Sequence, residues 1–143
     1  MNLIYKQFAT LKNNRKFFML VLFIPIITFF LQSCDNYGDK LVFGKGELYY
    51  KAPVSKELAD KLGNFLLESG FFGNENAASV QLLKENDTYQ FRMVVQEGKE
   101  KDESLNEVFK LFGSQISEAV LDGAKLEYHL CDKYFKTLKV INI

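Results

Sequence analysis

Apolar and polar residues follow three patterns along this chain of 143 residues. Residues 17–31 are almost uninterruptedly apolar, whereas after residue 46 the apolar residues recur at every second position or at helical spacing. A period of two predicts β-strands, and recurrence at i, i+4, i+7 and i+8 predicts one face of an amphipathic helix. The pattern therefore divides the chain into an apolar leader and a folded region.

The clearest alternation covers residues 88–96, where the apolar side chains are Tyr89, Phe91, Met93 and Val95. With residues 79–84 and a turn at 85–87, this segment predicts a β-hairpin. The alternation places Gln90 and Arg92 on the opposite face, which we expect to be wet or covered by a partner. Further strands are predicted at 46–51, 124–131 and 137–141.

Two helices are predicted between these strands. The first begins after Ser55, a favourable N-cap, and ends at Gly70. Gly63 within it predicts a close approach to a strand. The second begins at the capping-box sequence Ser104–Glu107 and ends at Gly123. Each has an apolar stripe, formed by Leu58, Leu62, Phe65 and Leu66 in the first helix and by Leu105, Val108, Phe109, Phe112, Ile116, Ala119 and Val120 in the second.

The predicted order is β-α-β-β-α-β with an additional C-terminal strand. Two helices packed on one face of an antiparallel sheet satisfy the layer rule for an α+β domain. The order matches the ferredoxin-like split β-α-β arrangement. We therefore expect residues 46–143 to form a single α+β domain.

The leader has the features of an export signal. Lys6, Lys12, Arg15 and Lys16 precede the apolar run, and no acidic residue occurs before Asp35. The run 17–31 contains 15 residues, whereas a membrane-spanning helix needs about 20 apolar residues. Pro25 would also weaken a regular helix. A cleaved signal peptide is thus favoured over a permanent span.

The run ends in the sequence Leu31-Gln32-Ser33-Cys34. It resembles the lipobox of bacterial lipoproteins, which has an aliphatic residue, then a small residue directly before a cysteine. The resemblance implies that residues 1–33 are removed by signal peptidase II, that the Cys34 thiol carries a diacylglyceryl group, and that the new amine is acylated. Residues 34–45 would then be a lipidated tether, and the domain would lie in the bacterial cell envelope. Two alternatives are an uncleaved anchor with unmodified Cys34, carrying a regulatory domain, and an ordinary secreted protein.

Cleavage before Cys34 changes the charge of the chain. Fourteen basic and 18 acidic residues remain, so the mature chain has a net charge of −4. No basic stripe of the kind that binds nucleic acid is present, and we expect no nucleic-acid partner. With Cys34 acylated, Cys131 has no partner for an intramolecular disulfide.

His129, the only histidine, and Cys131 are the candidates for chemistry. On a strand, i and i+2 side chains share a face about 7 Å apart, whereas a nucleophile and its base need about 3 Å. Two ligands are also too few for a zinc site. We predict no catalytic, metal or cofactor site, and a non-catalytic binding or structural domain. It would bind an envelope protein or a second copy through the sheet face around Gln90 and Arg92, or through a strand edge. The alternative is a small enzyme or redox protein that uses His129 and Cys131.

Overall fold

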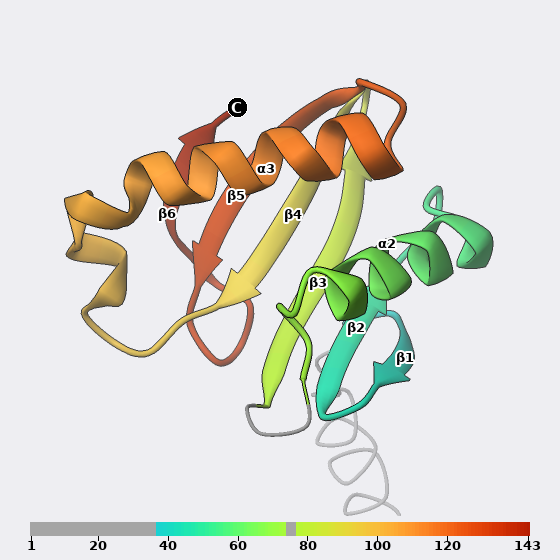
Figure 1. Ribbon diagram of the computed structural model, residues 1–143, viewed down its shortest axis with the longest axis horizontal. Coiled ribbons are helices and arrows are strands. Elements are labelled where there is room, and N and C mark those ends of the chain that lie inside the picture. Colours follow the sequence, from blue (N-terminus) through green and yellow to red (C-terminus); the bar gives the residue numbers. More distant parts are fainter. Residues whose placement is uncertain (1–36, 74–76) are drawn as a thin grey trace, which may run out of the picture. The chain divides into compact units, whose positions relative to one another are not determined.

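Six strands form one mixed sheet in which neighbours in sequence are neighbours in space (Figure 1). The computed structural model describes residues 37–73 and 77–143. The pairs β2–β3 and β4–β5 are parallel, and the other three pairs are antiparallel. The α+β class is confirmed, but the expected purely antiparallel sheet is wrong. The strands are β1 (Asp39–Phe43), β2 (Gly46–Tyr50), β3 (Ala78–Glu85), β4 (Thr88–Val94), β5 (Lys125–Cys131) and β6 (Thr137–Asn142).

Each helix joins two parallel strands that are direct neighbours. Helix α2 (Lys56–Glu68) connects β2 to β3, and α3 (Asn106–Val120) connects β4 to β5. Leu48 thus pairs directly with Val80, and Phe91 with Tyr128. In the split arrangement another strand would separate each pair, so the ferredoxin-like topology is wrong. Alternation shows which face a side chain occupies but not which strand lies beside it, and the same pattern fits both topologies.

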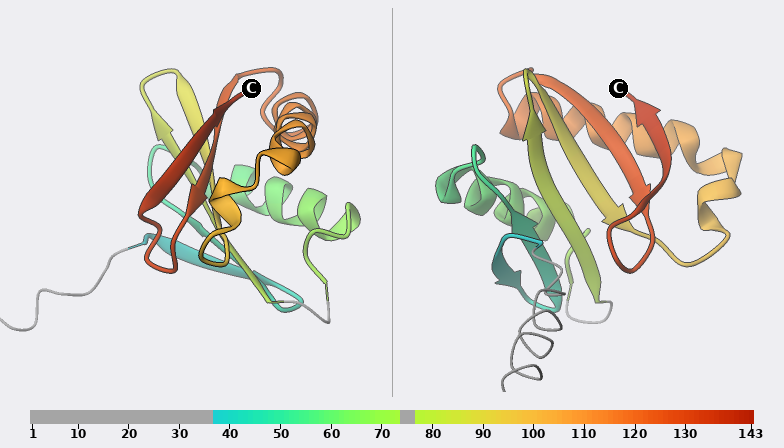
Figure 2. Two further views of the ribbon diagram at one scale, coloured as in Figure 1. Left: turned by 90° about the vertical axis from the view of Figure 1, so that its left-hand side faces the viewer. Right: turned by 180° about the vertical axis from the view of Figure 1, so that it is seen from behind.

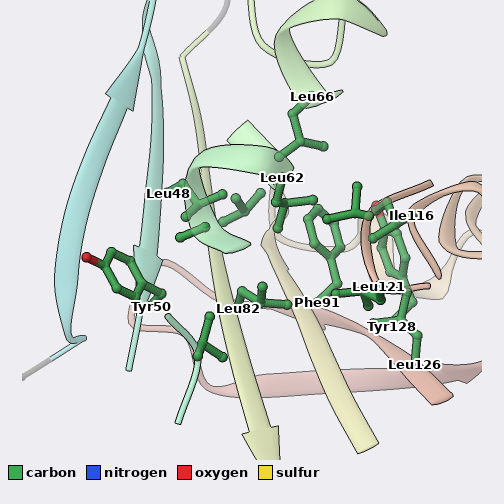
Figure 3. Close-up of a cluster of buried hydrophobic side chains, with 14 of the residues drawn as sticks. Leu48, Tyr50, Leu62, Leu66, Leu82, Phe91, Ile116, Leu121, Leu126 and Tyr128 are labelled. Atoms are coloured by element: carbon green, nitrogen blue, oxygen red, sulfur yellow. The ribbon is translucent and has the colours of Figure 1, made fainter. Parts of the chain in front are cut away.

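Both helices cover the same face of the sheet, as predicted (Figure 2, left). The buried side chains between the two layers form the hydrophobic core (Figure 3). Phe91 and Tyr128 lie at its centre, with ring centroids 5.0 Å apart. Phe72, in the segment that follows α2, is also buried. Other fully buried core residues include Leu48, Leu62, Leu66, Val80, Leu82 and Ile116.

Helix α2 begins and packs as the sequence predicts. The Ser55 hydroxyl oxygen accepts a hydrogen bond from the backbone nitrogen of Leu58 at 3.2 Å. Gly63 is buried, and a methyl group at this position would lie 2.0 Å from the ring of Phe43 on β1. The predicted close approach to a strand is therefore confirmed, and the contacting group is an aromatic ring.

The start of α3 differs from the prediction. Two short 3₁₀ helices, η1 (Lys99–Lys101) and η2 (Glu103–Leu105), precede it, and no side chain caps its first turn. The Asp102 carboxylate instead accepts hydrogen bonds from the backbone nitrogen and hydroxyl of Ser104. The predicted capping box is wrong because Ser104 lies within η2 and α3 begins two residues later, at Asn106. Val108 and Ala119, expected in the apolar stripe, are exposed.

The sheet begins earlier than predicted. Residues 39–43 of the expected tether form β1, which pairs with β2 from Asp39–Tyr50 to Phe43–Gly46. The predicted signal peptide and Cys34 lie outside the described residues. Within the described ranges, no helix is long and apolar enough to span a membrane.

Candidate functional site

A row of polar side chains crosses the face of the sheet opposite the helices. The strand register aligns Tyr49 with Gln81, Gln81 with Arg92, and Arg92 with His129. Because side chains alternate across a sheet, these four project from the face that the helices leave uncovered. The row includes Arg92 and His129, which the sequence singled out for binding and for chemistry. Gln90 and Cys131 lie outside it, two positions before Arg92 on β4 and two positions after His129 on β5.

Three aromatic rings cover this row from the solvent side. The ring centroids of Tyr37 and Tyr49 lie 5.8 Å apart, and that of Phe135 lies 5.2 Å from Tyr37 and 5.6 Å from Tyr49. Phe135 belongs to the turn between β5 and β6 and has a φ of 57°, an uncommon conformation for a bulky residue. We call Tyr37, Tyr49 and Phe135 the aromatic cover.

The main chain of the aromatic cover supplies acceptors to the polar row. The Gln81 side-chain amide donates to the Tyr37 carbonyl oxygen at 2.8 Å. The Arg92 guanidinium donates to the Phe135 carbonyl oxygen, and to the Gln90 side-chain oxygen at 3.1 Å. Gln90 is only 8% exposed. The expectation of a face that is wet or covered by a partner is therefore wrong around Gln90 and Arg92, because the chain covers this face itself.

His129 and Cys131 have separate surroundings although they share this face. The two ring nitrogens of His129 lie 3.1 Å from the Thr137 hydroxyl and 3.0 Å from a Glu127 carboxylate oxygen. The Cys131 sulfur is fully buried and lies 3.8 Å from the backbone oxygen of His129. Burial raises the pKa of the Cys131 thiol, which disfavours the reactive thiolate. The geometry thus supports packing and hydrogen-bonding roles for both residues.

The described residues contain no group of three or more His, Cys, Asp or Glu side chains arranged to hold a metal ion. A hollow of about 470 Å³ lies between the connection that follows β4 and the β5–β6 turn. Charges of both signs line it, among them Glu97, Glu100, Lys101 and Lys133. The hollow consequently has no clear preference for anions or cations.

The two edge strands of the sheet differ in their exposed surface. On β6, Leu138 is 43% and Val140 44% exposed, and Ile143 directly after it is 41% exposed. On β1, the exposed residues are Val42, at 61%, and the charged Asp39 and Lys40. A β-bulge opposite Leu130 and Cys131 disturbs the start of β6. Strand β6 therefore offers the more apolar free edge.

Sequence reasoning located the strands of this region but missed its cover. The sequence places Tyr37 in the predicted tether and Phe135 between two predicted strands, and predicts no contact between them. Their packing depends on residues 98 positions apart in the chain, so no local periodicity reports it. The aromatic character of both residues was the only available signal.

Residues 40–142 match the model of the AF_1994_N family, described as a family N-terminal domain. The chain belongs to this family. The match begins within β1 and ends at the last residue of β6, so the AF_1994_N unit comprises the whole sheet and both helices. Searches of curated proteins and of solved structures gave no match.

Proposed function

We propose that this AF_1994_N chain is a bacterial envelope lipoprotein, anchored through lipid at Cys34, whose domain binds a partner without catalysis. The observation that carries the binding role is the free edge of β6 with its exposed Leu138 and Val140. An exposed edge strand can pair with an added strand, because its backbone donors and acceptors on that side are available. Soluble proteins usually blunt such an edge with charges, proline or β-bulges. Strand β6 carries one lysine, Lys139, and a bulge only near its start, opposite Leu130 and Cys131.

The sheet face around Gln90 and Arg92 is a poorer candidate than this edge. The Gln81 side-chain amide already binds the Tyr37 carbonyl and the terminal Arg92 nitrogens bind Phe135 and Gln90, although the buried Arg92 Nε has no hydrogen-bond partner. Binding there would require the aromatic cover to open. Strand addition at β6 requires no such rearrangement.

The alternative of an enzyme using His129 and Cys131 receives no support from the geometry. Both ring nitrogens of His129 are engaged by Glu127 and Thr137, and the thiol of Cys131 is inaccessible. A nucleophile must reach its substrate and contact its base. The pair meets neither requirement in this conformation.

Photo-crosslinking tests the binding role with a matched control. A photoreactive phenylalanine analogue is placed at Val140 on β6, or at Val42 on β1, in the full chain expressed in bacterial cells. Both valines are exposed and lie on edge strands. We expect one discrete adduct from position 140 and none from position 42.

Sizing and mass spectrometry of the adduct distinguish a second envelope protein from a second copy of this chain. Either identity supports recognition through β6. Equal labelling from both positions, or no adduct from position 140, would contradict it. Intact mass analysis of the membrane-derived protein separately tests the anchor, because lipidation requires loss of residues 1–33 and an acylated Cys34.

A further inference from the structure

The described chain begins beside the turn that joins β5 to β6. Tyr37 packs against Phe135 of this turn, with ring centroids 5.2 Å apart. In Figure 2, left, the first described residues lie on the side of the sheet away from the helices, near the same turn. Any anchor that directly precedes residue 37 is thus attached close to the β5–β6 turn.

The proposed lipid site is very near this point. Tyr37 is three positions after Cys34 in the sequence. A fully extended chain covers at most about 3.6 Å per residue, so the two residues are at most about 11 Å apart. Since Tyr37 is packed into the aromatic cover, it cannot serve as a flexible spacer. A lipid at Cys34 would consequently hold this side of the domain against the bilayer surface.

The β5–β6 turn exposes residues suited to that position. Tyr134 is 58% exposed, whereas the neighbouring Phe135 is buried. Lys133 and Lys136 are exposed, and the Lys133 ammonium lies 4.9 Å from the centre of the Tyr134 ring. Tyrosine is enriched at membrane interfaces, and lysine can extend its ammonium to the headgroups.

The acidic residue of the turn is occupied internally. One Asp132 carboxylate oxygen accepts hydrogen bonds from the backbone nitrogens of Tyr134 and Lys136, at 2.8 and 2.9 Å. These bonds hold the backbone of the turn that carries Lys133, Tyr134 and Lys136. The turn therefore carries an exposed aromatic ring and two exposed lysines, although Glu97 and Glu100 line the same hollow as Lys133 and Tyr134.

We infer that the β5–β6 turn rests on the bilayer, with Tyr134 at the depth of the lipid headgroups and Lys133 and Lys136 beside the phosphates. This inference builds on the proposed lipidation of Cys34. The lipid supplies the anchoring energy, and the turn sets the orientation of the domain. Helices α2 and α3 cover the face of the sheet opposite the first described residues (Figure 2, left), and on this inference they face away from the bilayer.

The absence of tryptophan from the chain provides a direct test. Tyr134→Trp introduces one reporter at the turn, and Leu111→Trp introduces one on α3, where Leu111 is 64% exposed. Each lipid-bearing variant is reconstituted into phosphatidylethanolamine–phosphatidylglycerol vesicles that contain brominated lipids. We expect quenching of the tryptophan at 134 to exceed that at 111 at least twofold, with a blue-shifted emission. Equal quenching, or stronger quenching at 111, would overturn the inference.

A second variant tests the role of the charges. Adding Lys133→Glu and Lys136→Glu to the Tyr134→Trp chain is expected to reduce quenching at least twofold in the same anionic vesicles. Unchanged quenching would contradict the role of the lysines. Circular dichroism of each variant establishes that a lost signal does not come from unfolding.

Failure of the proposed lipidation remains distinguishable from failure of this inference. Intact mass without acyl groups would refute lipidation. The orientation is then measured on the chain from Cys34 onwards, whose Cys34 thiol is coupled to a maleimide lipid while Cys131 is buried. Preferential quenching at 134 in that preparation supports the orientation, and its absence refutes it.

Discussion

The two buried glycines of the helices should respond oppositely to the same substitution. Both Gly63 in α2 and Gly113 in α3 lie in helix interiors, where Ala is favoured over Gly by about 1 kcal/mol. A methyl group at Gly63 would lie 2.0 Å from the Phe43 ring, and one at Gly113 would lie 2.5 Å from the end of the Ile143 side chain. Ile143 is 41% exposed, so the end of its side chain can move towards solvent at little cost. Phe43 stacks on buried Phe72, with centroids 6.1 Å apart.

The magnitude for Gly63→Ala follows from the displacement of Phe43. Losing most of the burial of a phenylalanine ring costs about 1.5–3 kcal/mol, and losing an aromatic pair costs about 0.5–1.5 kcal/mol more. Subtracting the gain in helix propensity of about 1 kcal/mol leaves a net destabilisation of about 1–3.5 kcal/mol. Gly113→Ala should be neutral or stabilising by up to about 1 kcal/mol.

Urea denaturation of the chain from Asp35 onwards measures both effects. With a slope of about 1.5 kcal/mol/M for a domain of this size, Gly63→Ala should lower the midpoint by about 0.7–2.3 M. Adding Phe43→Leu removes the clash with the new methyl group. The loss in the free energy of unfolding of the double variant should therefore be smaller, by at least about 1 kcal/mol, than the sum of the losses of the two single variants. A Gly63→Ala protein as stable as the wild type, or strictly additive losses, would refute the packing argument.

Two further predictions concern titratable groups. Because Cys131 is buried and its pKa is raised, its thiol should resist an aromatic disulfide reagent at pH 8 in the folded chain and react fully in urea; rapid reaction of folded protein would contradict this. Two hydrogen bonds lower the pKa of the Glu47 carboxyl below its usual value of 4.5, the larger effect coming from Lys40 and the smaller from Tyr49. The ionised Glu47 carboxylate therefore stabilises the fold above pH 4.5, and this stabilisation is lost as the pH falls through the lowered folded-state pKa. Because the Lys40–Glu47 pair is partly exposed, Glu47→Gln should lower the free energy of unfolding at pH 7 by less than about 1 kcal/mol. The variant should also lose less stability than the wild type between neutral and acidic pH; an unchanged loss at acidic pH would refute this role of Glu47.

The sequence was sufficient for the elements that depend on local periodicity. The β3–β4 hairpin, the Ser55 cap, the Gly63 approach and the strand that ends at Cys131 were all predicted from short stretches. In each case the residues on one face of the element bury against the core. Periodicity reports this property directly.

The features that the sequence did not reveal depend on distant residues or on competing local bonds. Strand β1 was missed because residues 39–43 form a short segment next to Gly44 and were assigned to the tether. The aromatic cover joins Tyr37 to Phe135 across the sheet. The predicted capping box is wrong because Ser104 lies within η2, where Asp102 binds it, and α3 begins two residues later. The spacing of apolar residues along the chain carries no information about any of these three features.

The order of the strands explains why anchoring and recognition are assigned to different surfaces. Two adjacent β-α-β units meet at β3 and β4, so β1 and β6 are left as the edges. The lipid would be attached beside the β5–β6 turn, whereas Val140 lies three residues along β6 from Thr137, about 10 Å at the rise of a strand. A partner strand on β6 can therefore extend away from the bilayer while Tyr134 remains at its surface. On this arrangement, Val140→Lys should disturb partner binding and leave the vesicle quenching of the Tyr134→Trp reporter unchanged; loss of both together would mean that one surface serves both roles.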